Sequence, residues 1–317
     1  MMKTVSLLFC MLLSGNVMAQ TAATGIFQGN ADIGNPALKG SSTYNPADQS
    51  YSLKGSGYNI WFERDEFRYL SNQIEGDFIL TANFRFEGQG TDPHRKTGWM
   101  IRATEDEGSS HISAVVHGDG LTVMQWRDFK GAEMKDPEDE LFAKGSGYEI
   151  IQLERAGKIV FMRAAVAGKP FEEIGSYEMT NMPDKVLAGL FICSHNPEVT
   201  EQATIWNVRI DKPVGNNYNA SRDGAVGCRL ETMNVFDGKR MVIHEKQGRF
   251  EAPNWMPDGK QLLFNMDGLL YKIPVTGGAI TQLNTGTVKR NNNDHGISFN
   301  GKLLAISSSK DDAAGKG

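Results

Sequence analysis

The stretch FILTANFRF at residues 78–86 sets the pattern of the chain, because its even positions are apolar and polar Thr81, Asn83 and Arg85 alternate with them. Successive side chains of a β-strand point to opposite faces, so this stretch has one apolar and one wet face. Similar short runs, separated by turn residues, recur between residues 32 and 210, at 58–62, 67–70, 98–103, 113–116, 121–127, 148–155, 159–166, 186–193 and 203–210. This spacing predicts an all-β, antiparallel sandwich or barrel.

A repeat follows near the C-terminal end. The segment WMPDGKQLLF at residues 255–264 recurs as ISFNGKLLAI at 297–306, an offset of 42 residues. Periods of this size are typical of propeller blades, each built from four strands. Residues 269–273 and 280–283 complete the first blade, and a hairpin at 228–244 precedes it. The pattern predicts an incomplete β-propeller of about one blade with half a blade on each side.

Both parts resemble known families. The residues PNWMPDGK at 253–260, with Tyr271 and Gly277-Gly278, resemble the TolB-like, WD40-like propeller repeat, although the second copy has Phe299-Asn300 where the repeat usually has Pro-Asp. The N-terminal part is similar to concanavalin A-like lectin/glucanase jelly rolls, through GSGYNIW at 55–61, DEFRY at 65–69, GDF at 76–78, TGWMIR at 97–102 and VMQWR at 123–127. The two resemblances together imply an exported protein of the kind labelled TolB-like or biopolymer-transport component.

The N-terminus has the features of a secretory signal peptide. Lys3 precedes an apolar stretch at 4–13, and Val17-Met18-Ala19 forms a small-residue cleavage site. We expect a signal peptide at 1–19, a lead-in at 20–31, a sandwich at 32–211, a linker at 212–223 and the partial propeller at 224–317. Export to the periplasm, the cell surface or the medium follows, and no later segment is apolar for long enough to form a membrane-spanning helix.

Charge and cysteine content narrow the possible partners. Without Lys3 the formal charge is 32 − 38 = −6, which argues against nucleic acid, because its binding needs a basic surface. Cys193 and Cys228 remain after export. They could form a disulfide between the two domains or stay as separate thiols.

Candidate ligand contacts in the sandwich combine aromatic rings, which can stack on sugars, with polar groups that can bind hydroxyls. They are Trp61, Arg102, His111, Trp126 and Arg127, with Trp99 and His117 also available. The alternative is that the tryptophans fill the core and the arginines lie on a solvated face. At the expected mouth of the propeller the candidates are Asn254, Trp255, Asp294 and His295, and their alternative role is to fix loops.

The sequence favours binding over catalysis. Neither Glu63, Asp65 and Glu66 nor Glu172-Glu173 forms the strand-borne acidic pattern of jelly-roll glucanases, and residues 133–140 form a charge-rich segment expected to be a solvated loop. The six histidines and the cysteines lack metal-site spacing, and no Gly-x-Ser-x-Gly motif is present, so we expect no metal, cofactor or serine nucleophile. The prediction is an exported, non-catalytic protein that binds a glycan and/or an envelope protein. The alternative is a jelly-roll glycosidase or the N-terminal part of a propeller-containing peptidase.

Overall fold

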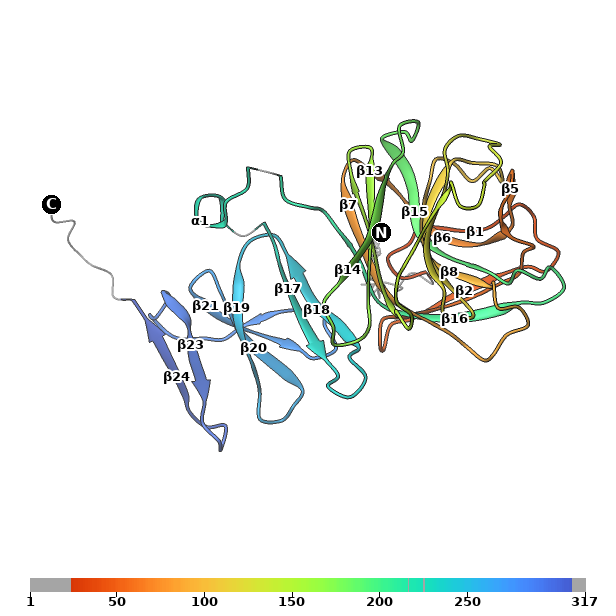
Figure 1. The fold of residues 1–317 in the computed structure, drawn as a ribbon. Coiled ribbons are helices and arrows are strands. Elements are labelled where there is room, and N and C mark those ends of the chain that lie inside the picture. Colours follow the sequence, from red (N-terminus) through yellow and green to blue (C-terminus); the bar gives the residue numbers. More distant parts are fainter. Residues whose placement is uncertain (1–23, 216, 225, 310–317) are drawn as a thin grey trace, which may run out of the picture.

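The computed structural model describes residues 24–215, 217–224 and 226–309. Apart from the short helix α1 (Ala220–Asp223), its regular elements are strands. Figure 1 shows a large sandwich beside a group of smaller C-terminal sheets. None of the helices in these ranges is long and apolar enough to cross a membrane. The expected signal peptide, residues 1–19, lies outside the described residues.

Two seven-stranded antiparallel sheets form the sandwich. Sheet A has the spatial order β1 (Gly29–Ile33), β6 (Phe67–Glu75), β15 (Lys185–Cys193), β8 (Lys96–Arg102), β9 (His111–His117), β10 (Thr122–Arg127) and β11 (Glu140–Phe142). Sheet B has the order β14 (Glu172–Glu178), β13 (Ile159–Ala165), β12 (Ile150–Ala156), β7 (Phe78–Phe86), β16 (Glu201–Asp211), β3 (Ser50–Gly55) and β2 (Ser41–Asn45). The chain crosses repeatedly between the sheets, as in a jelly roll. The all-β sandwich is therefore confirmed.

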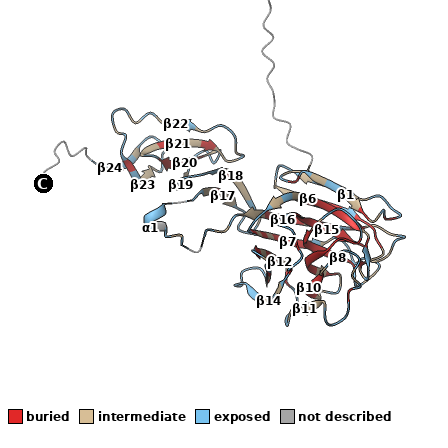
Figure 2. Ribbon diagram, turned by 90° about the horizontal axis from the view of Figure 1, so that it is seen from above, coloured by how far each residue is buried: buried red, intermediate tan, exposed pale blue. Residues whose placement is uncertain are grey.

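Sheet A is buried on both faces. Its inner face meets sheet B in a core that includes Trp99, Met124 and Leu190. Residues of opposite parity on its outer face, such as Met100 and Val123, belong to a second core. Burial is complete along β8, and it covers most of β15 and the first five residues of β6 (Figure 2). The second core exists because β4 (Ile60–Trp61) and β5 (Arg64–Asp65) lie over this outer face.

The C-terminal sheets follow the repeat strand by strand. They are the hairpin β17 (Cys228–Met233)–β18 (Arg240–Lys246), the four-stranded sheet β19 (Phe250–Trp255)–β20 (Gln261–Met266)–β21 (Leu269–Pro274)–β22 (Thr281–Gln282), and the hairpin β23 (Asn291–Ile297)–β24 (Leu304–Ser308). A separate apolar core is formed by residues of the hairpin β17–β18 and of the four-stranded sheet, among them Leu230, Phe250 and Phe264.

The first hairpin is tied to the sandwich by polar contacts. The Gln49 amide donates to the carbonyl oxygen of Val242 at 2.9 Å and accepts from the Val242 N–H at 2.8 Å. Lys239 pairs with Asp48 at 3.0 Å. The hairpin β17–β18 is therefore held at the edge of the sandwich near the β2–β3 turn.

The structure contains no bridge between Cys193 and Cys228, since both are free thiols. Cys193 ends β15 in the second core of the sandwich, whereas Cys228 begins β17 and packs against the small C-terminal core. The disulfide considered from the sequence is thus not formed, because the two side chains belong to different cores.

Candidate functional site

A buried carboxylate holds a surface segment onto sheet A. The segment, residues 56–66, is called the flap here and contains β4 and β5. Its Asp65 is fully buried, and Arg127 on β10 binds the two carboxylate oxygens at 2.7 and 2.8 Å. The Arg127 guanidinium also donates to the carbonyl oxygen of Phe62 at 3.0 Å. One arginine of the sheet therefore fixes both the backbone of the flap and its buried carboxylate.

Two further residues surround the same carboxylate. Arg102 Nη1 lies 3.5 Å and His111 Nε2 lies 3.8 Å from Asp65 oxygens, and both side chains are fully buried. Burial, followed by the positive charges of Arg127 and Arg102, holds the pKa of His111 well below its usual range. A buried ion pair needs such close hydrogen-bonded geometry to offset the cost of desolvation.

Four of the predicted ligand contacts are buried in the structure. Arg102, His111 and Arg127 are at most 1% exposed, so they support the flap and do not reach a ligand. Trp126 is 3% exposed and stacks on Tyr177 with ring centroids 3.9 Å apart, which makes it a core residue. Side chains alternate between the two faces of sheet A along these strands. Because both faces are buried, the tryptophan on the inner face and the charged residues on the outer face are all buried.

Beside the flap, the outer face of sheet A opens into a groove of about 350 Å³. Its floor comes from β8, β9 and β10, and its walls come from the flap, the loops at 92–95 and 194–196, and the segment around β11. The lining residues are Asn59, Trp61, His94, Lys96, His117, Leu121, Gln125, Asp136, Glu140, Phe142 and His195. Of the predicted sandwich contacts, Trp61 and His117 are in this groove.

Lys96 joins the floor to the flap. Its ammonium donates to Asn59 Oδ1 at 2.9 Å and to the carbonyl oxygen of Ile60 at 3.1 Å, and it lies 5.7 Å from the centre of the Trp61 ring. Burial lowers the pKa of Lys96 to about 8. Lys96 thus fixes the backbone beside Trp61, whose side chain is partly exposed at the groove.

The floor also contains polar atoms that the protein leaves without hydrogen bonds. His117 is 5% exposed, and neither ring nitrogen has a partner among the described residues. Burial, then the neighbouring Lys96 charge, lowers the pKa of His117 to about 2. Gln125, 4% exposed, donates its amide to Glu140 at 3.1 Å, while its Oε1 has no partner in the same set of residues.

The rim is rich in titratable groups. Asp92 lies 3.3 Å from His195 Nδ1, and the His94 ring lies 5.6 Å from that of His195 and 5.8 Å from that of His117, between centroids. Burial raises the pKa of Glu140, and the Asp136 carboxyl group raises it further. Within the described residues these groups do not form a cluster with the geometry of a metal site.

Sequence reasoning missed most of the groove. The sequence pattern does not indicate His94, Lys96, Gln125, His195 or Glu140. The prediction of a solvated loop is wrong for Glu140, which begins β11 and accepts a hydrogen bond from Gln125. The parity of β8, β9 and β10 could have revealed Lys96 and Gln125, because both share a face with His117. The loop residues could not be found in this way.

The predicted propeller-mouth residues lie elsewhere, in the C-terminal sheets. Asn254 on β19 donates to the carbonyl oxygen of His295 on β23 at 3.3 Å, so the structure brings these two together. Trp255 is 56% exposed, and Asp294 is exposed on β23. None of the four lines the groove on sheet A.

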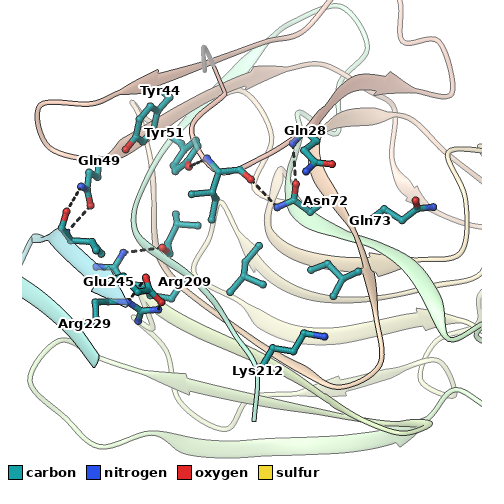
Figure 3. Close-up of a pocket in the computed structure, with 15 residues that line it drawn as sticks. Gln28, Tyr44, Gln49, Tyr51, Asn72, Gln73, Arg209, Lys212, Arg229 and Glu245 are labelled. Atoms are coloured by element: carbon teal, nitrogen blue, oxygen red, sulfur yellow. Dashed lines mark hydrogen bonds and ion pairs between the residues drawn. The ribbon is translucent and has the colours of Figure 1, made fainter. Parts of the chain in front are cut away.

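A second cavity, of about 590 Å³, lies between the sandwich and the hairpin β17–β18. Figure 3 shows Tyr44, Tyr51 and Gln49 on the sandwich side and Arg229 and Glu245 on the hairpin side. Arg229 pairs with Asp211 at 2.6 Å and with Glu245 at 3.1 Å. The charged groups of this cavity therefore stabilise the contact between the sandwich and the hairpin β17–β18. In the groove on sheet A, by contrast, some polar atoms of the lining residues have no hydrogen-bond partner among the described residues. We take the groove as the candidate site.

No protein-family model matches the chain. Uncharacterized protein Atu1656 of Agrobacterium fabrum (strain C58) is 44% identical over 85 residues, which are 26% of this chain and 29% of that protein. The match spans less than a third of that relative's length.

Similar solved structures have low identities. A functionally unknown protein from Saccharomyces cerevisiae is 14% identical, covering 59% of this chain and 97% of that chain, with a TM-score of 0.45. The family 7 alginate lyase A1-II' is 7% identical over 56% of this chain and 83% of its own, with a TM-score of 0.38. The exoplasmic/lumenal domain of VIP36, in a Ca²⁺/Man3GlcNAc-bound form, is 9% identical over 58% and 86%, with a TM-score of 0.36.

The contact between Asp65 and the arginines gives a stability prediction. Asp65→Asn should lower the free energy of unfolding by about 3–5 kcal/mol, because it leaves two buried guanidinium groups without their counter-charge. Glu87→Gln is the control. It removes the partner of exposed Arg85, 3.6 Å away, and should cost less than about 1 kcal/mol. Denaturant unfolding measures both, and equal losses would contradict the buried network.

The buried histidines give a pH prediction. His111 and His117 stay neutral in the folded protein but take up protons in the unfolded chain below about pH 6.5, and stability rises with pH wherever the unfolded state binds more protons. The free energy of unfolding should therefore fall from pH 6.5 to pH 5, by up to about 2 kcal/mol for each histidine. His117→Gln should make the slope shallower in denaturant titrations at several pH values. An unchanged slope would show that His117 is not buried as described.

Proposed function

We propose that the groove on sheet A binds a glycan chain without cleaving it. The observation that carries this proposal is the pairing of a partly exposed Trp61 ring with the accessible polar side chains of Asp136 and Glu140 in one concave site. Sugar rings offer apolar faces and hydroxyl groups together, and sites that combine aromatic and a few convergent polar groups suit them. Exposed Phe142 extends the apolar wall of the same groove.

The positions of the acids support binding without hydrolysis. Glycoside hydrolysis uses two carboxyl groups about 5–10 Å apart on either side of the scissile bond. In the groove, Asp136 and Glu140 lie on one rim and interact with each other. This arrangement suits hydrogen bonding to sugar hydroxyls better than acid and base catalysis.

A polysaccharide-cleaving enzyme is the second candidate, because Asp92 orients His195 through its Nδ1 at 3.3 Å. An oriented imidazole is a suitable general base. New chain ends released from a bound polysaccharide, and their loss in His195→Ala, would favour this candidate over binding alone.

We infer further that residues 224–309 belong to a TolB-like propeller that binds an envelope protein. Propeller blades are four-stranded sheets arranged around a central channel. The four-stranded sheet β19–β22 and the offset of 42 residues support this assignment. The contacts of β23 with its neighbours agree, since Asn265 donates to the carbonyl oxygen of Asn292 at 2.8 Å.

The glycan proposal is tested with an array of bacterial, plant and host glycans. The protein should bind at least one class, and Trp61→Ala should weaken that binding about tenfold or more, because the main stacking surface is lost. Phe129→Ala is the matched control, since Phe129 is 60% exposed and does not line the groove. Silence across the whole array would defeat the proposal.

Export is tested by expressing the chain with its first nineteen residues intact. The protein should appear in the periplasm, at the cell surface or in the medium, and mass spectrometry should find Gln20 at its N-terminus. Retention in the cytoplasm with an uncleaved N-terminus would contradict an envelope role.

A further inference from the structure

The tip of the flap presents an aromatic side chain in a backbone conformation that favours a smaller residue. The pairing of Trp61 with Arg64 leaves residues 62 and 63 as the two-residue turn between β4 and β5. Phe62, the first of them, has a φ of 53°, and a positive φ at this position of a tight hairpin turn favours glycine. Among the described non-glycine residues with positive φ, Phe62 is the one with a large apolar side chain. Turn chemistry alone therefore does not account for a phenylalanine here.

The surrounding segments hold the main chain of Phe62 and leave its ring exposed. The carbonyl oxygen accepts hydrogen bonds from Arg127 Nη2 at 3.0 Å and from the Met134 N–H at 3.3 Å. Both bonds use the backbone of Phe62, so a smaller residue would make them equally well. The side chain itself is 51% exposed. Residues held in unfavourable backbone conformations cluster where ligands are contacted, and this ring is free to make such a contact.

Phe62 lies between the groove and a second hollow of about 300 Å³. Trp61 lines the groove, whereas Glu63 lines the hollow. Two residues of chain span at most about 7 Å, so the two cavities approach each other at the flap tip. The segment that follows β10 runs the same way, since Gly131 lines the hollow and Asp136 lines the groove. A chain-like ligand that leaves the groove at this end therefore meets Phe62 first.

The hollow offers acceptors for sugar hydroxyl groups. Glu63 and Glu107 line it and are exposed, and their carboxylates have no hydrogen-bond partner among the described residues. Lys130, which also lines the hollow, is paired with Asp106 at 2.7 Å. Ionised carboxylates accept hydrogen bonds from hydroxyl groups. The hollow thus combines an adjacent aromatic ring with two available acceptors.

We propose that a bound glycan leaves the groove across the flap tip, stacks one sugar ring on Phe62 and continues into the hollow. A phenyl ring offers a broad apolar face, which suits the apolar face of a sugar ring. The ligand is then an extended segment of a polysaccharide, which occupies more of the surface than a mono- or disaccharide held in the groove. This inference rests on the proposed glycan-binding function and names the class of ligand for that site.

The test measures how affinity depends on chain length, with the whole protein. The probes are the di- and hexasaccharides of the cello, manno and galacto series, together with the same two lengths of any class that binds on the glycan array. Within a bound class, the hexasaccharide should bind about tenfold or more tightly than the disaccharide, because it alone reaches the ring of Phe62 and the hollow.

Substitutions of Phe62 separate a ligand contact from a structural role. Phe62→Asn removes the ring but keeps a residue that tolerates a positive φ. It should lower hexasaccharide affinity about tenfold and narrow the gap between the two lengths, while its midpoint of thermal unfolding equals or exceeds that of the unchanged protein. Phe62→Tyr, which keeps an aromatic ring, should keep the gap. Phe129→Ala is the matched control, because this exposed phenylalanine lines neither the groove nor the hollow.

A second pair of variants tests the far end of the path. The double substitution Glu63→Ala and Glu107→Ala removes both acceptors and should lower hexasaccharide affinity about fivefold or more. Glu105→Ala is the control, because Glu105 is exposed on the same loop and does not line the hollow.

The outcomes separate the two proposals. Equal affinity for the two lengths of a bound class, or a gap that Phe62→Asn leaves unchanged, would overturn the inference while glycan binding stands. A lower thermal midpoint for Phe62→Asn would also overturn it, since the ring would then support the fold. A failure to bind any hexasaccharide or any member of the array would instead defeat the proposed function.

Discussion

The contact between the Asp65 carboxylate and the Arg127 guanidinium determines what the outer face of sheet A can do. Without it, the flap would have little reason to lie on that face, and apolar residues such as Met100 and Val123 would be exposed to water. A buried ion pair of this kind adds little net stability compared with apolar replacements, but losing one partner is costly. We therefore interpret the pair as a device that fixes one position of the flap.

The groove is a consequence of that position. The flap covers part of the sheet face and places Trp61 at the border of the groove, where Lys96 holds its backbone through Asn59 and the carbonyl of Ile60. The groove lies beside the flap and is lined by His117 and Gln125. The candidate site thus lies where the flap no longer covers the outer face of sheet A. Its aromatic wall, Trp61, is positioned by the contacts that also hold the flap over the second core.

Most of the interior strands of the sandwich could be predicted from the sequence, and the strands at its edges could not. β7 was found from its alternation, and the central strands of both sheets followed from their apolar runs. In the two large sheets, the strands without a predicted run are β1, β11, β14 and β2, which lie at the ends, and β3, which lies next to β2. An edge strand pairs on one side only and is commonly short or charged, as in EEIGSYE of β14, so it lacks the apolar signal. The site residues were equally hard to predict, because their roles depend on segments that are distant in the sequence. Arg127 binds Asp65 of the flap, and Glu140 accepts a hydrogen bond from Gln125.

The bond between Gln49 and Val242 has a mechanical consequence. The side-chain amide donates and accepts as a peptide group does in a β-ladder, so it acts as one extra rung between the sandwich and β18. A pull on the C-terminal sheets would thus load this rung and the pair of Lys239 with Asp48 alongside the connection from β16 to β17. Tension would reach the edge of sheet B first, on the opposite layer from the groove, and the groove would be shielded from it by the sandwich core.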